Sequence, residues 1–469
     1  MYETVVGIEV HVELKSNSKV FSHSQNEYST EPNIYVNEID LGMPGVLPVL
    51  NKKVIDMALQ ASIALNCKIN KVMHFDRKNY FYPDLPKGYQ ITEQDTPIGY
   101  DGYIKISDKN IGIERLHIEE DTCKSIHGKN GTMLNANRAG VPLIEIVSKP
   151  DMRSASDAVE YLTKLREILL YLGISDVKIE EGSMRCDCNV SVHKVGTPFG
   201  TKIEVKNIGS INNVGEAIQY ETKRQIELLE KGETLKEETR RFDDKSMATI
   251  LMRVKETGND YRYFPEPDIP YVSISDEWID QVKENMPVFA DELKEKYESL
   301  GINNNNIKTI LSRLDLCNFL ESVINDTDPV IAANLITGDI LSYLNKNFIS
   351  ISNVKLTKEN FIELVNMIKE DKLSSKQTKE VLPYILENGG DIISAIKVLG
   401  LEEIKDESEL KKLVQTVLDN NIESINDYKN GHDRALKYLM GQVMKESKGK
   451  ANPNVCSNLI IEMLKNYWL

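Results

Sequence analysis

The chain has 469 residues, of which 41% are hydrophobic and 28% charged, and this composition is typical of a globular protein with two or three domains. No hydrophobic run approaches the ~20 residues of a membrane-spanning helix, and a strand pattern starts almost at residue 1, so we expect neither a membrane anchor nor a signal peptide. Six scattered cysteines favour reduced thiols in the cytoplasm, and a net charge of −15 excludes RNA binding except through a local basic region.

The first predicted element is a strand at residues 8–14, where hydrophobic and polar residues alternate strictly. Glu9, His11 and Glu13 share its polar face, with successive members about 6.5–7 Å apart. A single row of this kind is typical of an ordinary half-solvated strand. Matching rows on other strands would instead indicate one wall of a metal and phosphate site.

Three later segments carry such polar residues. Glu145 is a lone carboxylate within the hydrophobic run at residues 141–147, and burial of an unpaired carboxylate is costly, so it requires a cation or a donor. Asp187 shares a strand face with Arg185, and Glu120 lies on the face opposite to that of Glu119. We therefore expect several carboxylates to meet on one sheet.

Together these residues supply the oxygen-rich ligands that Mg²⁺ prefers, and two such ions clamp a nucleoside triphosphate during phosphoryl transfer. The predicted ligands are Glu9, His11, Glu120, Glu145 and Asp187. The sequence contains no Walker A loop, dinucleotide fingerprint or nucleophile elbow. An ATP site in this chain is therefore predicted to be a strand-borne carboxylate site.

Two proline-rich aromatic loops, at residues 79–90 and 259–270, are each either a rigid surface loop or a surface that stacks a base. The cations near these loops and near the acidic rows could hold phosphates or the end of an RNA, or they could form structural ion pairs. These cations are Lys78, Arg185 and Arg262.

The second half of the chain has helical periodicity. We predict a mixed domain at 1–290, a helical domain at 291–400 and a small helical tail at 401–469. Residues 429–469 hold seven Lys or Arg and three Asp or Glu, a net charge of +4 in an otherwise acidic chain. This reversal favours contacts of the tail with RNA phosphates over an ordinary solvated face.

Long motifs resemble the B subunits of glutamyl-tRNA(Gln)/aspartyl-tRNA(Asn) amidotransferases over essentially the whole chain. They are YETVVGIEVHVEL at 2–14, RKNYFYPDLPKGYQIT at 77–92, NRAGVPLIEIV at 137–147, EEGSMRCD at 180–187, DYRYFPEPD at 260–268 and GQVMKESKGKANP at 441–453. The resemblance implies an α+β fold, with an antiparallel-sheet cradle related to glutamine synthetase, then an all-α domain and a YqeY-like tail.

The resemblance also implies an activity. ATP phosphorylates the side-chain carboxylate of misacylated Glu-tRNA(Gln) or Asp-tRNA(Asn), and ammonia then displaces the phosphate. It implies a heterotrimer with a small C subunit and an amidase A subunit that makes ammonia from glutamine. The metal ligands of the family fall on the five predicted ligands, with the choice between Glu119 and Glu120 left open.

The chain departs from this family at a zinc knuckle of four cysteines, whose positions here hold Ser22, Ser24, Asn37 and Asp40. We therefore predict no structural zinc. Two other functions compete with the transamidase subunit. The carboxylate rows argue against a non-catalytic tRNA scaffold, and the basic tail argues against a free-standing ligase that acts on a small amino acid.

Overall fold

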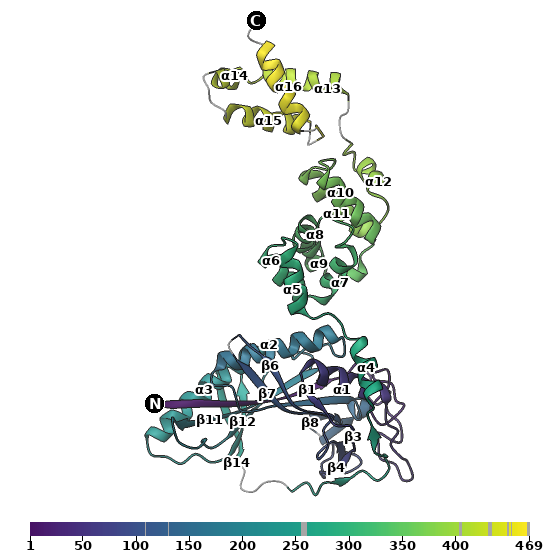
Figure 1. Cartoon of the computed structure of the whole chain (residues 1–469), viewed down its shortest axis with the longest axis vertical. Helices are drawn as coiled ribbons and strands as arrows, with labels where there is room; N and C mark the ends of the chain where they lie inside the picture. Colours follow the sequence, from purple (N-terminus) through teal and green to yellow (C-terminus); the bar gives the residue numbers. More distant parts are fainter. Residues whose placement is uncertain are drawn as a thin grey trace. The chain divides into compact units, whose positions relative to one another are not determined.

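The computed structural model describes residues 1–107, 109–129, 131–254, 260–402, 406–429, 434–447, 450–451 and 453–466 (Figure 1). The chain divides into two compact units, Met1–Ala290 and Asp291–Leu469, and each is described by itself. The further division at residue 400 stays a prediction.

The first unit is built on a nine-stranded sheet with β1 at its centre. In spatial order the strands are β14 (Ala248–Val254), β13 (Glu238–Asp243), β12 (Ile203–Lys206), β11 (Met184–Lys194), β1 (Tyr2–Glu13), β10 (Pro142–Ser148), β7 (Asn110–Glu120), β6 (Gly99–Lys105) and β2 (Lys68–Ile69). Only β12 and β13 among these pair in parallel; the other neighbours are antiparallel. Segments far apart in the chain thus become neighbours of β1.

The alternating sequence of β1 gives the sheet two different faces. Ile8, Val10 and Val12 are at most 1% exposed, whereas Glu9 and His11 lie on the opposite face and are only partly buried. The neighbouring strands continue this division, because directly opposed residues of antiparallel strands point to the same side. One face is therefore hydrophobic and the other polar.

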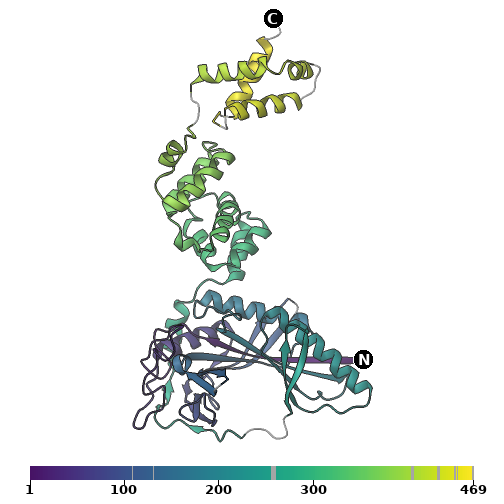
Figure 2. The ribbon, with the colours of Figure 1, turned by 180° about the vertical axis from the view of Figure 1, so that it is seen from behind.

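Helices α1 (Lys52–Ala64), α2 (Ala155–Leu172) and α3 (Ile211–Glu230) cover the hydrophobic face. Both views show α2 and α3 running along the same side of the sheet (Figure 1, Figure 2). In α2, Ser154 caps the start by accepting a hydrogen bond from the Asp157 amide, and Gly173 ends the helix with a φ of 68°. The polar face stays without a helical cover from these three elements.

Short strands, one 3₁₀ helix and one α-helix complete the first unit. They are a three-stranded sheet of β15 (Phe264–Pro265), β4 (Asp76–Asn79) and β5 (Tyr89–Thr92), the pairs β16 (Val272–Ser273) with β3 (Val72–Met73) and β8 (Lys124–Gly128) with β9 (Gly131–Asn135), the 3₁₀ helix η1 (Ala136–Arg138), and α4 (Asp276–Glu284). Strand β5 contacts β7 of the large sheet. The first aromatic loop, which joins β4 to β5, is thereby held close to the large sheet.

The second unit is helical throughout its described residues. Its elements are α5 (Ala290–Ser299), α6 (Asn304–Leu311), α7 (Leu314–Val323), α8 (Pro329–Leu335), the π turn η2 (Ile336–Ile340), α9 (Leu341–Asn347), the 3₁₀ turn η3 (Ile351–Asn353), α10 (Lys358–Lys369), α11 (Ser375–Asn388), α12 (Ile392–Val398), α13 (Glu407–Asp419), α14 (Ile422–Lys429), α15 (Arg434–Glu446) and α16 (Pro453–Asn466). Leu418, Leu439 and Ile460 belong to a core shared by the last four helices. A mainly antiparallel sheet followed by helices confirms the α+β class. None of the helices that the structure describes has the length and hydrophobicity required to cross a membrane.

Candidate metal and phosphate site

The candidate site lies on the polar face of the large sheet, where side chains of five adjacent strands meet. Cross-strand register places Glu9 opposite Asp187 and places His11 opposite both Glu145 and Arg185. A cavity of about 450 Å³ opens on this face. Its lining includes His11, Lys78, Glu119, Arg185, Asp187 and Lys206.

The first group in the site, triad 1, consists of His11, Glu119 and Glu145. His11 Nε2 lies 3.4 Å from Glu119 Oε1 and 3.5 Å from Glu145 Oε2. A second imidazole, that of the buried His117, lies 3.1 Å from the same Glu145 oxygen and 3.7 Å from Glu119 Oε2. Two imidazoles and two carboxylates thus form a closed cluster on β1, β10 and β7.

The charges of triad 1 depend on one another. Burial alone would raise the pKa of the Glu145 carboxyl, but His117 and His11 hold it well below its usual value. Burial would lower the pKa of His117, yet Glu145 and Glu119 raise it to about 9. The pKa of His11 is likewise raised, because Glu145 and Glu119 outweigh the effect of burial. The two carboxylates therefore favour the protonated form of both imidazoles.

The second group, triad 2, consists of Glu9, Asp187 and Glu204. Two of its carboxylates are held by neutral donors: Asn189 Nδ2 donates to Glu9 Oε1 at 2.8 Å, and Thr239 Oγ1 donates to Glu204 Oε2 at 2.9 Å. The ammonium of Lys206 lies 2.5 Å from Asp187 Oδ2 and 3.0 Å from Glu204 Oε1. The side chains of Asn189, Thr239 and Lys206 thus orient the three carboxylates of triad 2.

Negative charge is concentrated at triad 2. Burial raises the pKa of the Glu9 carboxyl, and the neighbouring carboxylates of Glu145, Asp187 and Glu204 raise it further, against the effect of the hydrogen bond from Asn189. Carboxylates that lie this close and repel one another form a group that a cation stabilises.

The donor set of both triads fits divalent cations. In each triad one ligand atom from every residue lies within 4.8 Å of the others. Five of the six residues offer carboxylate oxygens, which suit Mg²⁺ and Mn²⁺, and the imidazole of His11 is a ligand that Mn²⁺ accepts readily. The described residues of this face can therefore hold two divalent cations.

The structure corrects one predicted ligand. Glu120 points to the opposite face from Glu119 and does not join either triad. Its carboxylate pairs with Lys87 Nζ at 2.5 Å and accepts a hydrogen bond from the amide of Ile91 at 2.9 Å. Strand alternation is the reason, because consecutive residues of β7 lie on opposite faces. Glu119, the alternative that the sequence left open, occupies the place predicted for Glu120.

The three predicted cations are placed differently. Lys78 lines the cavity, and Glu119 and Glu145 keep the pKa of its ammonium above the usual value although burial opposes this. Arg185 also lines the cavity and pairs with Asp121 Oδ2 at 2.9 Å. Arg262 is not among the lining residues; it has a φ of 48°, and its carbonyl accepts a hydrogen bond from the Asn79 side chain. Arg262 therefore shapes the second aromatic loop.

Sequence reasoning missed three residues of the polar face. His117 lies two residues before Glu119 on β7, so the period-2 rule could have placed both on one face. Glu204 and Lys206 have the same relation on β12, but this strand is only four residues long and offers too short a pattern to recognise. Their proximity to Asp187 follows from the pairing of β12 with β11.

A buried network centred on the Asp40 carboxylate occupies the four positions at which we predicted no zinc site. Ser22 Oγ donates to Asp40 Oδ1 at 2.7 Å, and Ser24 Oγ donates to Oδ2 at 2.6 Å. The fully buried Lys19 ammonium lies 3.1 Å from Asp40 Oδ2 and donates to the Tyr35 carbonyl at 2.7 Å. Asn37 adds a backbone hydrogen bond to Asp40. An ion pair therefore ties together the segments around residues 19–40.

Aromatic side chains surround a smaller cavity of about 190 Å³ that shares Lys78, Gln90 and Thr122 with the larger one. Tyr80 and Tyr261 line it, and the ring of Tyr80 stacks on that of Tyr82 with centroids 5.5 Å apart. These aromatic rings are partly exposed: Tyr80 is 39% and Tyr82 58% accessible. The two aromatic loops thus meet beside triad 1.

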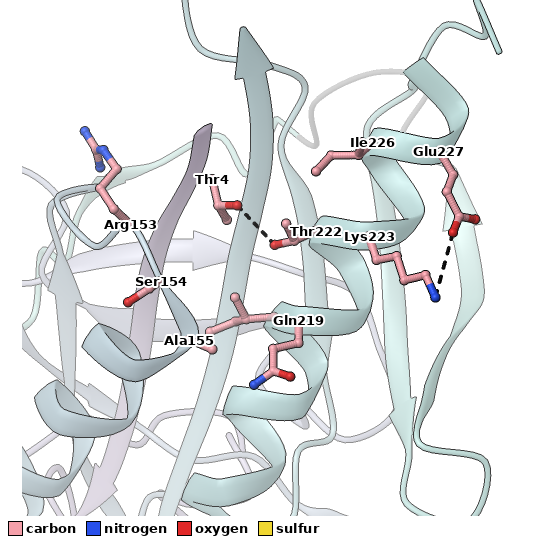
Figure 3. A pocket seen from close by; sticks show the side chains of 10 residues that line it. Thr4, Arg153, Ser154, Ala155, Gln219, Thr222, Lys223, Ile226 and Glu227 are labelled. Carbon is pink, nitrogen blue, oxygen red and sulfur yellow. Dashed lines mark hydrogen bonds and ion pairs between the residues drawn. The ribbon is translucent and has the colours of Figure 1, made fainter. Parts of the chain in front are cut away.

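A further cavity of about 450 Å³ lies elsewhere in the first unit (Figure 3). The start of β1, the first turn of α2 and the second half of α3 line it. Thr4 and Thr222 are joined there by a hydrogen bond of 3.3 Å, and Lys223 and Glu227 of α3 point toward each other at 4.0 Å. Glu227 is its only carboxylate among the lining residues that the structure describes. The polar face is therefore the better candidate site.

The fold and the site define a class: an α+β protein whose antiparallel sheet presents two carboxylate-rich triads suited to divalent cations and phosphate. Two family models match, the GatB/GatE catalytic domain at residues 4–280 and the GatB domain at residues 318–464. The chain is similar to proteins named as the B subunit of aspartyl/glutamyl-tRNA(Asn/Gln) amidotransferase. It is 46% identical to that of Enterococcus faecalis (99% of each chain), 47% to that of Halalkalibacterium halodurans (98% of each) and 46% to that of Lactococcus lactis (99% of this chain, 100% of the relative).

This chain therefore belongs to the family of amidotransferase B subunits. The resemblance seen in the sequence motifs is confirmed over nearly the full length of the chain. Membership defines an enzyme subunit that takes part in forming a C–N bond.

Proposed function

We propose that the chain is the subunit of a tRNA-dependent amidotransferase that activates the side-chain carboxylate of Glu-tRNA(Gln) or Asp-tRNA(Asn) with ATP. The observation that carries this proposal is the pair of triads on adjacent strands. They offer two cation sites beside one cavity of about 450 Å³, as phosphoryl transfer from a nucleotide requires.

The chemistry explains why ATP is needed. A carboxylate is a poor acyl donor, because its leaving group would be an oxide. An oxygen of the substrate carboxylate attacks the γ-phosphorus, the bond to the ADP oxygen breaks, and an acyl phosphate forms. Ammonia then attacks the acyl carbon, inorganic phosphate leaves, and one proton is lost from the nitrogen. The product is Gln-tRNA(Gln) or Asn-tRNA(Asn).

The side chains of the polar face divide this work. Triad 1 and triad 2 would each hold one divalent cation, and bound cations supply the charge neutralisation that phosphoryl transfer requires. Asn189 and Thr239 keep the carboxylates of triad 2 turned toward the site. Lys78 lines the same cavity and would orient anionic groups of the substrates. Arg185 instead pairs with Asp121. Glu119 takes the role first assigned to Glu120.

The acceptor end of the tRNA would reach this cavity across the aromatic loops. A terminal base is unpaired, and exposed Tyr80 and Tyr82 offer faces on which it can stack. The adjoining cavity of about 190 Å³ gives that base a place next to Lys78. This arrangement would bring the esterified amino acid close to triad 1.

The remaining parts of the proposal follow family membership. The ammonia would come from an amidase A subunit, and a small C subunit would complete a heterotrimer in the cytoplasm. We propose that the first unit is a cradle related to glutamine synthetase and that residues 401–469 form a YqeY-like tail that contacts tRNA. The network around Asp40 supports a loop that holds without zinc.

The test uses Asp187→Ala in the reconstituted complex. We expect loss of ATP-dependent phosphorylation of Glu-tRNA(Gln) and Asp-tRNA(Asn), measured as γ-phosphate transfer, with nearly unchanged tRNA affinity. Ammonium should replace glutamine for the wild-type chain without its partners, whereas glutamine alone should not be used. Unchanged phosphorylation by Asp187→Ala would overturn the assignment and favour a scaffold that only presents tRNA.

A further inference from the structure

Lys206 makes a contact that the proposed chemistry does not use. It is the last residue of β12, and its ammonium lies between Asp187 and Glu204, two of the three members of triad 2. The oxygens that it contacts belong to the same carboxylates that would bind a divalent cation. An ammonium at 2.5–3.0 Å and a metal ion at about 2.1 Å compete for such oxygens.

We propose that Lys206 is a displaceable counter-cation of triad 2: it neutralises the empty triad, and a divalent cation binds tightly there only when a phosphate group draws the ammonium away. This inference rests on the proposed function, and it adds an order of events. The cation of triad 1 binds first, and the cation of triad 2 binds together with the nucleotide.

The surroundings of Lys206 permit such a movement. Its side chain is 33% exposed and it lines the cavity in which a phosphate would lie. A lysine ammonium is a compact charge on four flexible carbons, so it can exchange a carboxylate partner for a phosphate without any movement of the backbone. Three carboxylates whose oxygens lie within 4.8 Å of one another would repel if Lys206 left without replacement.

Triad 1 is built differently. Among the described residues, the groups that pair with its carboxylates are the imidazoles of His11 and His117, not an ammonium. Of the two triads as the structure describes them, only triad 2 therefore holds an ammonium between its carboxylates, and a phosphate group can accept that ammonium when a divalent cation replaces it.

Arg185 provides a matched control within the same cavity. It is also a cation on the polar face, but it pairs with Asp121 at 2.9 Å and with no member of either triad. Replacement of Arg185 by methionine removes one positive charge from the cavity, as replacement of Lys206 does. It leaves the contacts of Lys206 with Asp187 and Glu204 in place.

The experiment measures Mn²⁺ binding to the reconstituted complex by electron paramagnetic resonance, with Lys206→Met, Lys206→Arg and Arg185→Met compared with the wild type. Without nucleotide we expect a second, weak Mn²⁺ in the wild type that binds at least tenfold more tightly in Lys206→Met. The second Mn²⁺ should still bind weakly to Lys206→Arg, and Arg185→Met should change the affinity for this ion by less than threefold. Addition of a non-hydrolysable ATP analogue should tighten the second Mn²⁺ in the wild type much more than in Lys206→Met.

Three results would overturn the inference. They are equal or weaker binding of the second Mn²⁺ by Lys206→Met, equal tightening by Arg185→Met, and an effect of the analogue that is the same with and without Lys206. If Lys206→Met does not fold, Lys206→Gln takes its place, and the effect of the analogue on wild-type Mn²⁺ binding tests the same coupling. Absence of Mn²⁺ binding from every variant would overturn the proposed function as well, whereas Mn²⁺ binding that is independent of Lys206 would overturn only this inference.

Discussion

The imidazole of His11 and the carboxylate of Glu145 face each other across two adjacent antiparallel strands, with Nε2 and Oε2 3.5 Å apart. The pairing joins residues that are more than 130 positions apart in the chain. It turns two separate polar rows into one cluster, because β10 also brings Glu145 next to His117 of β7. The site is thus a product of sheet order rather than of any local motif.

Strand alternation at residues 119 and 120 gives the first prediction. Glu119→Gln should reduce ATP-dependent phosphorylation of the misacylated tRNA by about 100-fold, because it removes a ligand of triad 1, and it should leave the fold intact. Glu120→Gln should instead destabilise the protein by about 3–5 kcal/mol, because it leaves Lys87 buried without its charged partner. Phosphate-transfer assays and urea unfolding of both variants measure the two effects.

A reversed pattern, with Glu120→Gln inactive but stable, would return the ligand assignment to Glu120. Equal loss of activity in both variants after correction for the folded fraction would show that neither residue is specific to the cation.

The buried ion pair of Lys19 and Asp40 gives the second prediction. Asp40→Asn should lower the free energy of unfolding by about 3–5 kcal/mol, because it leaves the Lys19 ammonium buried and uncompensated. The matched substitution Asp176→Asn in the half-exposed pair with Lys15 should cost at most about 1 kcal/mol. Because the network contains its own cation, we expect a zinc-selective chelator that does not bind Mg²⁺ to leave the unfolding curve of the wild type unchanged. A shift of that curve by this chelator would contradict a zinc-free loop.

A carboxyl group outside the site gives a pH-dependent prediction. Glu93 is fully buried, Oε2 accepts hydrogen bonds from the amides of Ile98 and Ile118, and Oε1 has no hydrogen-bond partner. Burial raises its pKa to about 8, from the 4.5 of an ordinary glutamate. The folded state therefore favours the neutral acid, and the free energy of unfolding decreases as the pH rises from about 4.5 to about 8, by about 1.4 kcal/mol for each pH unit.

Glu93→Gln removes this dependence because an amide does not ionise. The difference in unfolding free energy between Glu93→Gln and the wild type should grow in favour of the variant from pH 5 to pH 8 and then level off. Urea titrations at several pH values measure it, with Glu181→Gln in an exposed pair as the control. A difference that stays constant over this range would show that Glu93 is charged in the folded state.

The sequence predicts the residues of the site better than their arrangement. Period-2 alternation places Glu9 and His11 on one face of β1, because one buried face suffices to define it. The same rule could not choose between Glu119 and Glu120, since the last five residues of β7 are all buried. Lys206 illustrates the other limit: its place in triad 2 depends on the pairing of β12 with β11, which no local pattern specifies.

The aromatic cavity gives a prediction about the tRNA substrate. Tyr80→Ala should raise the KM for the misacylated tRNA by about 5-fold to 150-fold, which corresponds to the ~1–3 kcal/mol of one base–aromatic stack. The value of kcat should change little, because Tyr80 touches neither triad, and Tyr80→Phe should behave as the wild type since it keeps the ring. A decrease in kcat with an unchanged KM would assign the ring to the chemical step instead.

The basic surface of α15 gives the last prediction. Arg434, Lys437 and Lys445 are exposed, while Ala435, Leu439 and Val443 of the same helix are buried in the core of the second unit. If this face contacts tRNA phosphates, replacement of the three cations by alanine should weaken tRNA binding and reduce the slope of log K against log salt by about 1 for each lost contact. Filter binding at several salt concentrations measures both effects. The control replaces the exposed Lys308, Lys346 and Lys358, which removes the same charge from other helices; an equal reduction in slope by the control would mean that overall charge, and not the face of α15, determines the affinity.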